Sequence, residues 1–385
     1  MSSEPPPTGA ALRAAFDAPE PLTVGIEEEL MLLDPETLDL VPRARELVDR
    51  AAGDPRFKLE LPASQLEIVT APARSVPEAL GELAAGRAGL AELASGLARP
   101  AAAAVHPFAP AEGELNRDER YIHTIERFGR VARRQLVCAL QVHVAVGGAD
   151  RTLAVHNALR SYLPELAALA ANGPFHEGQD TGLASVRPKI SEGLPRQGVP
   201  PPLRSWDELA EDLSWGLRSG GLPSPRVWWW ELRAHPVFGT LELRVPDAQT
   251  TLTEAAAVAA FAHSLVGRLV ERFDAGERLA CDPTWRIAEN RWSAASRGVE
   301  GTMADLETGE PRPARDRLTE LIRDLEPVAA RLGCAQELAS CASLVERNGA
   351  MRQREVAAGE GLLGLARWLA DRFLERPPDL PGVEA

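Results

Sequence analysis

The chain has 385 residues, a formal net charge of −14, 45% hydrophobic residues and 25% charged residues. A chain of this length and ordinary composition can bury a large core, which excludes the collagenous, low-complexity and disordered classes. The acidic surplus argues against general binding to nucleic acid or to an anionic membrane, because long-range attraction to phosphate needs net positive charge. A protein with this acidic surplus can still bind a small anionic ligand at a local site.

The cysteines and the N-terminal sequence indicate a cytoplasmic location. None of the four cysteines stands in a CxxC pair, so idle or buried thiols are favoured over a disulfide framework or a structural zinc site. The first residues lack the basic start and apolar core of a signal peptide. The longest apolar stretch, residues 255–262, is far shorter than the ~20 residues of a membrane span.

Short segments with period-two patterning alternate with longer segments of helical periodicity. We expect strands at 22–33, 58–69, 136–147, 227–233 and 239–246. We expect helices at 43–52, 77–98, 117–133, 151–171, 206–219, 252–273 and 283–297, and an entirely helical region at 313–375. These elements predict an α+β fold with one domain over residues 20–375, between flexible tails at 1–19 and 376–385.

One long segment, residues 172–204, is rich in Gly and Pro and has no apolar period. A loop of this length inside a compact domain is usually functional or disordered. We therefore consider it a candidate lid over a binding site.

The first expected strand carries three consecutive acids, Glu27, Glu28 and Glu29. In a strand, Glu27 and Glu29 share one face and Glu28 lies on the other. Apolar flanking residues favour a buried strand with two carboxylates on its inner face. The alternative is an edge strand with a solvated acidic face.

The second expected strand carries Glu60 and Glu67. Glu67 lies between Leu66 and Ile68, on the face opposite both. Glu60 comes just before Pro62, which can end one extended piece. A plain amphipathic strand is the alternative, and it is hard to dismiss for Glu60.

Two further strands place polar groups opposite an apolar face. Glu242 and Arg244 share a face with Thr240, where a surface ion pair worth well under ~1 kcal/mol is the alternative. Gln141 and His143 share a face opposite three valines. A single His is more often structural, but its place beside Gln on a polar face favours a functional role.

Several of these acids on one sheet would need compensation. Two carboxylates ~4 Å apart repel by roughly 4 kcal/mol at an effective dielectric near 20, so protons or bound cations must neutralise them. Oxygen ligands select Mg²⁺ or Mn²⁺ over zinc, and Mg²⁺ usually shares its coordination with substrate phosphates. With Arg244 available for phosphate charge, the residues predict a metal–nucleotide site on an antiparallel sheet.

Arginines and aromatic residues outside these strands are weaker candidates. Arg187 in the long segment and Arg233 after the Trp228–Trp230 run could clamp a carboxylate or phosphate bidentately. For any one of 40 arginines, an ordinary surface position is the alternative. Asn290–Trp292 and Asn348–Ala350 have no physical account at this stage.

Eight motifs occur in order over about residues 20–375: GIEEE, SQLEIVT, HPF, ERY, NGPFHEGQDTGLASVR, WWELRAHPVFGTLELRVPD, ENRW and NGA. Together they resemble the bacterial carboxylate–amine ligases of the glutamate–cysteine ligase type 2 family. The resemblance implies a glutamine-synthetase-like fold, in which a curved antiparallel sheet forms a funnel with helices outside. It also implies ATP-dependent joining of a carboxylate, such as that of glutamate, to cysteine or another amine through an acyl phosphate.

The resemblance assigns roles to particular residues. The magnesium ligands, with manganese as an alternative ion, would be Glu27, Glu29, Glu60, Glu67 and Glu242. The catalytic arginines would be Arg244, Arg187 and Arg233, and the substrate-binding residues would be His143, Gln141, Arg120 and Tyr121. The family commonly shows a GxHVHVG-like strand where this chain reads ALQVHVA, so that Gln141 replaces a His, and Ala139 and Ala145 replace glycines.

Two other functions remain open at this stage. One is a phosphotransferase of the guanidine kinase type, and the other is a non-catalytic relative that binds Mg²⁺ and nucleotide. The expected partners are ATP, Mg²⁺ and small amino-acid and amine substrates, without nucleic acid or membrane. A homodimer is one candidate assembly, and the sequence does not identify the physiological acid or amine.

Overall fold

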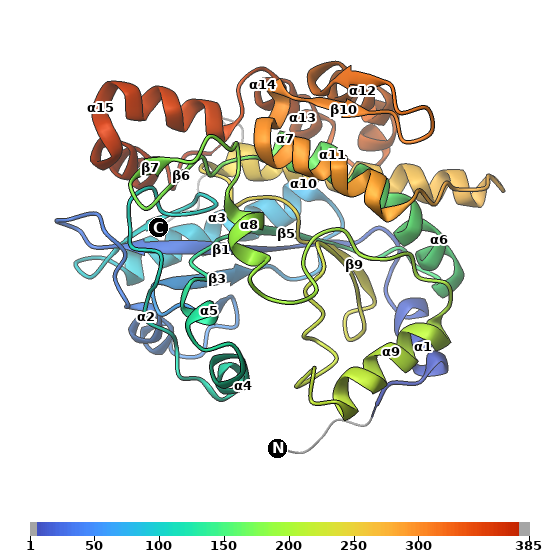
Figure 1. The fold of residues 1–385 in the computed structure, drawn as a ribbon, viewed down its shortest axis with the longest axis horizontal. Helices are drawn as coiled ribbons and strands as arrows, with labels where there is room; N and C mark the ends of the chain where they lie inside the picture. Colours follow the sequence, from blue (N-terminus) through green and yellow to red (C-terminus); the bar gives the residue numbers. More distant parts are fainter. Residues whose placement is uncertain (1–5, 377–385) are drawn as a thin grey trace.

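The computed structural model describes residues 6–376, and an antiparallel sheet runs through its centre (Figure 1). The order across the sheet is β2-β3-β1-β5-β9-β8, and β4 pairs with β1 outside this path. The strands are β1 (Val24–Leu33), β2 (Phe57–Leu59), β3 (Gln65–Val69), β4 (Arg99–Ala101), β5 (Leu140–Val144), β8 (Leu232–His235) and β9 (Thr240–Leu243). All these pairings are antiparallel, as the sequence predicts.

Helices pack against the apolar face of the sheet. Helix α3 (Val76–Leu93) contacts β1 and β3, and α10 (Leu252–Asp274) contacts β5. Most of α10 is buried and rich in alanine, so it can approach its neighbours closely at the centre of the core. Thr251 and Glu254 form a capping box at its start, which satisfies amide groups that the first turn leaves free.

The C-terminal part of the chain is helical, as predicted. Its helices gather along one side of the molecule, at the top of Figure 1. They are α11 (Thr284–Arg297), α12 (Ala314–Arg331), α13 (Ala335–Ala339), α14 (Cys341–Glu346) and α15 (Gly349–Asp371), with the short pair β10 (Thr302–Ala304) and β11 (Pro311–Pro313) between the first two. Helices α12, α13 and α14 all contact α10, so this layer closes the core from outside.

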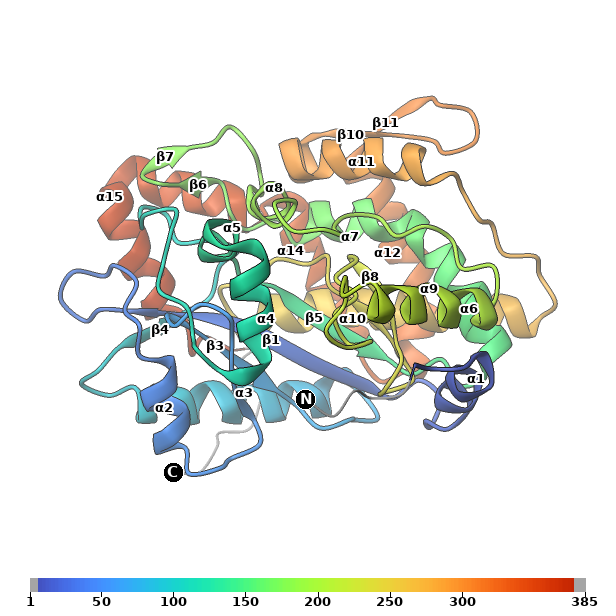
Figure 2. The same ribbon diagram turned by 60° about the horizontal axis from the view of Figure 1, so that its bottom comes forward.

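The remaining elements, apart from η2, lie in the first two thirds of the chain, and most of them are labelled in Figure 2. They are α1 (Gly9–Asp17), α2 (Ala44–Arg50), α4 (Glu119–Phe128), α5 (Arg130–Arg133), α6 (Ala149–Leu159), η1 (Arg160–Tyr162), α7 (Leu163–Leu169), β6 (Phe175–His176), β7 (Gln179–Asp180), α8 (Arg187–Ser191), α9 (Trp206–Arg218) and η2 (Gly298–Glu300). Among all described helices, none is long and apolar enough to cross a membrane. The four cysteines are free thiols, as predicted.

Several expected elements are interrupted in the structure. The strand expected at 58–69 is two strands, because Pro62 lies between β2 and β3 and cannot donate a ladder hydrogen bond. The helix expected at 117–133 ends at Gly129, whose φ of 52° leaves the helical region. The strand expected at 227–233 begins only at Leu232, so the three tryptophans precede it.

The N-terminal segment differs from the flexible tail expected at 1–19, because it contains helix α1. Leu12 and Phe16, four residues apart, are buried on one face of this helix. Phe16 stacks on Trp206 of α9 with ring centroids 4.4 Å apart. Thr8 caps the helix by accepting a hydrogen bond from the Ala11 amide. Residues 1–5 and 377–385 lie outside the described part of the chain.

The segment 172–204 is more ordered than a long loop. It contains the β6–β7 hairpin and α8, and its backbone bonds back on itself where the Val186 amide donates to the Gly173 carbonyl at 2.9 Å. Pro188 and Gly198 line a pocket beside the sheet. The segment therefore forms a wall of that pocket, and a lid movement stays a prediction.

Candidate active site

The polar face of the sheet carries the predicted acids side by side. Within β1, Glu28 is fully buried on the helix side, whereas Glu27 and Glu29 lie on the opposite face. The antiparallel register sets Glu29 opposite Glu67 of β3 and His143 of β5 opposite Glu242 of β9. Strands far apart in the sequence thus bring their acids to one surface.

A first group of acids consists of Glu29, Glu60 and Glu67. Each offers a carboxylate oxygen, and these oxygens lie within 4.8 Å of one another. Burial, followed by the charge of Glu29, raises the pKa of Glu60 to about 8. Burial and the neighbouring acids raise the pKa of Glu67 well above its usual value, and burial also raises the pKa of Glu29. This group therefore holds protons at neutral pH unless a cation replaces them.

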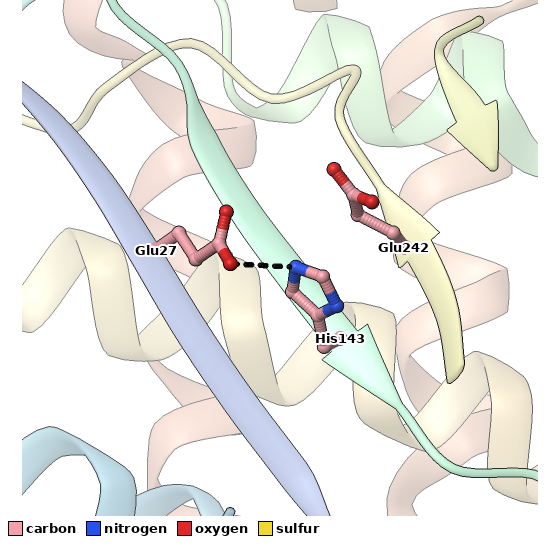
Figure 3. Close-up of side chains that lie close together, drawn as sticks. All are labelled: Glu27, His143 and Glu242. Carbon is pink, nitrogen blue, oxygen red and sulfur yellow. Dashed lines mark ion pairs between the residues drawn. The ribbon is translucent and has the colours of Figure 1, made fainter. Parts of the chain in front are cut away.

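A second group consists of Glu27, His143 and Glu242 (Figure 3), whose ligand atoms also lie within 4.8 Å of one another. The Nε2 atom of His143 is 3.3 Å from the Glu27 carboxylate. Burial opposes ionisation of Glu27, but the hydrogen bond and charge of His143 lower its pKa overall. The sequence predicted His143 for substrate binding, and the structure also makes it a candidate metal ligand.

Two arginines hold Glu242 in place. Arg233 on β8 donates from Nε and Nη2 to its two carboxylate oxygens at 2.5 and 2.8 Å, and Arg244 Nη1 donates to Oε1 at 2.5 Å. Burial alone would raise the pKa of Glu242, but the two guanidinium groups lower it well below its usual range. Glu242 is therefore ionised in the folded protein.

Gln141 connects the two groups of acids. Its Nε2 donates to Glu29 Oε1 at 2.8 Å, and its Oε1 accepts a hydrogen bond from Arg244. The other Glu29 oxygen accepts from the Ala139 amide at 2.7 Å. The glutamine that departs from the family pattern thus orients one acid and one arginine of the site.

A pocket that is open to solvent lies beside the first group of acids. Its lining includes Glu29, Glu60, Arg244, Tyr121 and Trp229. The hydroxyl of Tyr121 donates to the Leu59 carbonyl at 2.6 Å, which fixes the ring in the wall. The pocket thus combines carboxylates, a cation and aromatic surface, which suits a small polar substrate.

The other predicted arginines have different surroundings. Arg187 lines the pocket, but its Nε donates to Asp247 at 2.7 Å and its Nη2 donates to the Val245 carbonyl at 2.6 Å. These bonds occupy much of its donor capacity. Arg120 is exposed and donates to the Leu59 carbonyl, so it lies outside the pocket lining.

The acid groups fit divalent cations by their donor chemistry. Three carboxylates with raised pKa values lose their protons readily only when a cation compensates the charge, and an ion of the Mg²⁺ or Mn²⁺ type would do so. The group of Glu27, His143 and Glu242 adds one imidazole to two carboxylates. The carboxylates suit Mg²⁺ or Mn²⁺, whereas imidazole is more typical of Zn, Cu, Fe and Ni sites.

Comparison with known proteins gives the family of the chain. A sequence model of the glutamate–cysteine ligase family 2 matches residues 23–363. A protein of Rubrobacter xylanophilus, whose name gives it as a candidate glutamate–cysteine ligase 2-3, is 40% identical over 91% of this chain and 97% of its own length. A candidate glutamate–cysteine ligase 2 of Thermobifida fusca is 35% identical over 90% of each chain. The chain belongs to glutamate–cysteine ligase family 2.

Solved structures similar to this family member confirm the expected fold class, a glutamine-synthetase-like antiparallel sheet with helices outside. A glutamate–cysteine ligase of Francisella tularensis, solved in complex with AMP, matches with a TM-score of 0.64 over 93% of this chain and 90% of its own. A bifunctional glutathione synthetase of Pasteurella multocida matches with a TM-score of 0.57 over 95% of this chain and 54% of its own. Both are 14% identical in sequence, so the likeness concerns the fold.

Several residues of the site in this family member were not assigned a role from the sequence. Glu231 lines the pocket, and Arg291 of α11 donates to both of its carboxylate oxygens at 2.7–3.1 Å. Asp247 holds Arg187. Glu231 and Asp247 belong to the WWELRAHPVFGTLELRVPD motif, and Arg291 belongs to ENRW, so these motifs could have pointed to all three residues. The ion pair of Glu231 and Arg291 could not be predicted, because the two residues are 60 positions apart.

Two asparagines of these motifs have structural contacts. The Asn290 side chain exchanges hydrogen bonds with the backbone of Ala304 at 2.7 and 2.8 Å. Asn348 caps α15 by accepting from the Met351 amide at 3.2 Å. A Cβ on the adjacent Gly349 would come within 2.0 Å of the Asn172 side chain, so the backbone must approach closely there.

Proposed function

We propose that the protein is an ATP-dependent ligase that joins a carboxylate, such as that of glutamate, to cysteine or another amine. The observation that supports this proposal most directly is the pairing of two ligand groups on one sheet face, one of Glu29, Glu60 and Glu67 and one around Glu242. Acyl-phosphate chemistry needs this arrangement, because phosphate charge must be neutralised next to a substrate pocket.

Each ligand group has its own task in this proposal. The group of Glu29, Glu60 and Glu67 would hold one Mg²⁺ beside the pocket, and the group of Glu27, His143 and Glu242 would hold another. When bound, these ions neutralise the phosphates of ATP and the charge that develops as the phosphoryl group is transferred.

Arg244 adds a positive charge to that of the metal ions. It lines the pocket and contacts both Gln141 and Glu242, so its charge lies between the two groups. We assign it to the transferring phosphoryl group, while Arg233 positions Glu242 from the edge strand.

Exclusion of water completes the mechanism. The substrate carboxylate attacks the terminal phosphate of ATP, ADP leaves, and the amine then attacks the acyl phosphate and releases phosphate. Water would hydrolyse this intermediate. The wall built by the segment 172–204, which includes Arg187, would help to keep water away from the intermediate.

Replacement of Glu242 by Gln tests the proposal. The Glu242→Gln variant should lose ATP turnover, and circular dichroism should show that it stays folded. The Glu67→Gln variant gives a second readout, because its neutral amide resembles the protonated acid that the raised pKa favours. It should fold normally and need more Mg²⁺. Glu126→Gln, an exposed position on α4, is the matched control. Normal turnover in both folded site variants would contradict the assignment.

Product analysis separates the proposed ligase from the two other functions. The protein is incubated with ATP, Mg²⁺, glutamate and a panel of amines, and the products are read by mass spectrometry. A ligase needs both acid and amine before much ADP appears. A phosphotransferase would produce ADP and a phosphorylated acceptor without amide formation, and a non-catalytic relative would bind Mg-ATP without turnover.

A further inference from the structure

One arginine beside the pocket lacks an acidic partner. Arg196 lies in the segment between α8 and α9, and the next residues, Gln197 and Gly198, line the pocket. Its guanidinium is 5.5 Å from the ring centroid of Trp229, which also lines the pocket. No carboxylate of residues 6–376 forms an ion pair with it. The neighbouring site arginines Arg187, Arg233 and Arg291 all have such a partner.

The side chain of Arg196 is also poorly satisfied. Its Nε is buried without a hydrogen-bond partner in the described part of the chain. Leaving a buried donor without a partner costs about 1–3 kcal/mol, and more when the group is charged. A structural role would not require this cost, whereas an incoming anion would remove it.

The charge that acts on Arg196 has the same sign. Arg127 of α4 acts on it electrostatically, and burial together with this charge lowers the pKa of Arg196. Arg127 itself donates to the Gly220 carbonyl rather than to an acid. Two cations thus act on each other in a protein with a net charge of −14, which favours an anion at this place.

The backbone at Arg196 adds a further cost. Its φ is 60°, in the left-handed region that a residue with a Cβ rarely adopts. Such strain is common where a side chain must be held toward a ligand. Trp229 provides a flat surface that fixes the guanidinium plane, and Trp229 in turn contacts Phe128 with centroids 6.1 Å apart.

We propose that Arg196, supported by Trp229, binds a substrate carboxylate that does not react, and thereby selects amino-acid substrates. This inference rests on the proposed ligase function and adds a specificity-determining residue to it. The planar fork of Arg matches a carboxylate bidentately. The carboxylate can come from the acid substrate, as the α-carboxylate of glutamate, or from the amine substrate, as the carboxylate of cysteine.

The test compares substrates with and without the second carboxylate. Glutamate is compared with 4-aminobutyrate, which keeps the reacting group, and cysteine is compared with cysteamine. In Arg196→Gln, the KM for one of the two amino acids should rise about ten-fold to a hundred-fold, with a smaller change in kcat. The KM for its decarboxylated analogue should stay unchanged. The amino acid that is affected identifies the source of the carboxylate.

Two further variants complete the experiment. Arg218→Gln, an exposed arginine in the last turn of α9, should behave as the wild type. Arg196→Lys keeps the charge without the fork and should give an intermediate KM. If Arg196→Gln does not fold, Arg196→Lys and Trp229→Leu are measured in its place.

Calorimetric titration with glutamate and with cysteine measures binding directly and tests the role of Arg196 without any need for turnover. Weaker binding of one amino acid to the Arg196 variants, at unchanged binding of its analogue, supports it. Unchanged binding of both amino acids, or equal weakening of an amino acid and its analogue, overturns it. If no amide forms with any substrate, the proposed function fails while the binding result still decides the role of Arg196.

Discussion

Glu28 and Arg87 form an ion pair in which both side chains are fully buried. Arg87 of α3 donates from Nε and Nη2 to the two Glu28 oxygens at 2.8 and 2.5 Å. It also donates to the backbone carbonyls of Gln249, Thr250 and Phe373 at 2.7–3.1 Å. One guanidinium therefore ties the central strand to the start of α10 and to the end of the last helix.

Loss of Arg87 should destabilise the protein strongly. Arg87→Ala leaves Glu28 buried without a partner, and we expect it to lower the free energy of unfolding by about 3–5 kcal/mol. The measurement is urea unfolding followed by circular dichroism.

The matched control for Arg87 is Arg99→Ala. Arg99 pairs with Asp371 at 2.5 Å, with side chains 33% and 59% exposed, so its loss should cost about 1 kcal/mol or less. Equal effects of the two substitutions would show that the buried pair is not a structural anchor.

Stability without divalent cations should fall as the pH rises from about 7 to 8. The folded pKa of Glu60 is about 8, and that of Glu67 is raised well above its usual value. In this range the folded state holds protons that the unfolded state has lost, so deprotonation favours unfolding, on the order of 1 kcal/mol per pH unit. Burial lowers the pKa values of His106 and His156 to about 4 and that of His235 to about 3, so these rings are neutral in the folded state. In the unfolded state they take up protons as the pH falls toward ~6.5, which opposes the carboxylate effect there, so the expected fall begins at about pH 7.

Thermal unfolding across this pH range checks the sign, with and without MgCl₂. Bound cation replaces the protons, so Mg²⁺ should flatten the pH dependence, and calorimetry in buffers of different ionisation enthalpy should detect proton release on binding. The Glu60→Gln variant should remove much of the slope. Stability that rises between about pH 7 and 8 in chelator would contradict the proton-holding cluster.

Replacement of Gln141 should weaken metal binding. Gln141→Leu removes the bond to Glu29 and the acceptor for Arg244. Because such partners orient ligating carboxylates, we expect the Mg²⁺ concentration for half-maximal activity to rise about ten-fold to a hundred-fold.

The control for Gln141 is Gln179→Leu, at an exposed position of β7. An unchanged Mg²⁺ requirement in Gln141→Leu, at wild-type stability, would show that the bridge between Glu29 and Arg244 does not position the site.

One cysteine should react quickly with a thiol reagent in the native protein. Cys281 is exposed, whereas Cys138, Cys334 and Cys341 are buried. Burial also raises the pKa values of these three thiols, which lowers their thiolate fraction. We expect one fast thiol in the native state and four after denaturation, and Cys281→Ser should abolish the fast phase. Two or more fast thiols would contradict the burial of the others.

The strand pattern around Glu27 could be read from the sequence because it is local. Period-two alternation separates Glu28 from its two neighbours, and the structure places Glu28 in the core and the others on the opposite face. The apolar residues between the acids predicted the central strand for the same reason. Interruptions such as Gly129 and the late start of β8 were not predicted, because backbone conformation there depends on tertiary contacts.

The sequence by itself determined the fold class, the family and the set of acidic residues, since alternation and motif order are properties of neighbouring residues. Only the tertiary structure decided how those acids are grouped. The register between β5 and β9 puts His143 beside Glu242. Contacts between residues far apart in the sequence pair Arg87 with Glu28 and leave the Nε of Arg196 without a hydrogen-bond partner. These pairings depend on distances between strands and helices that no local pattern encodes, and burial then fixes which carboxylates keep their protons.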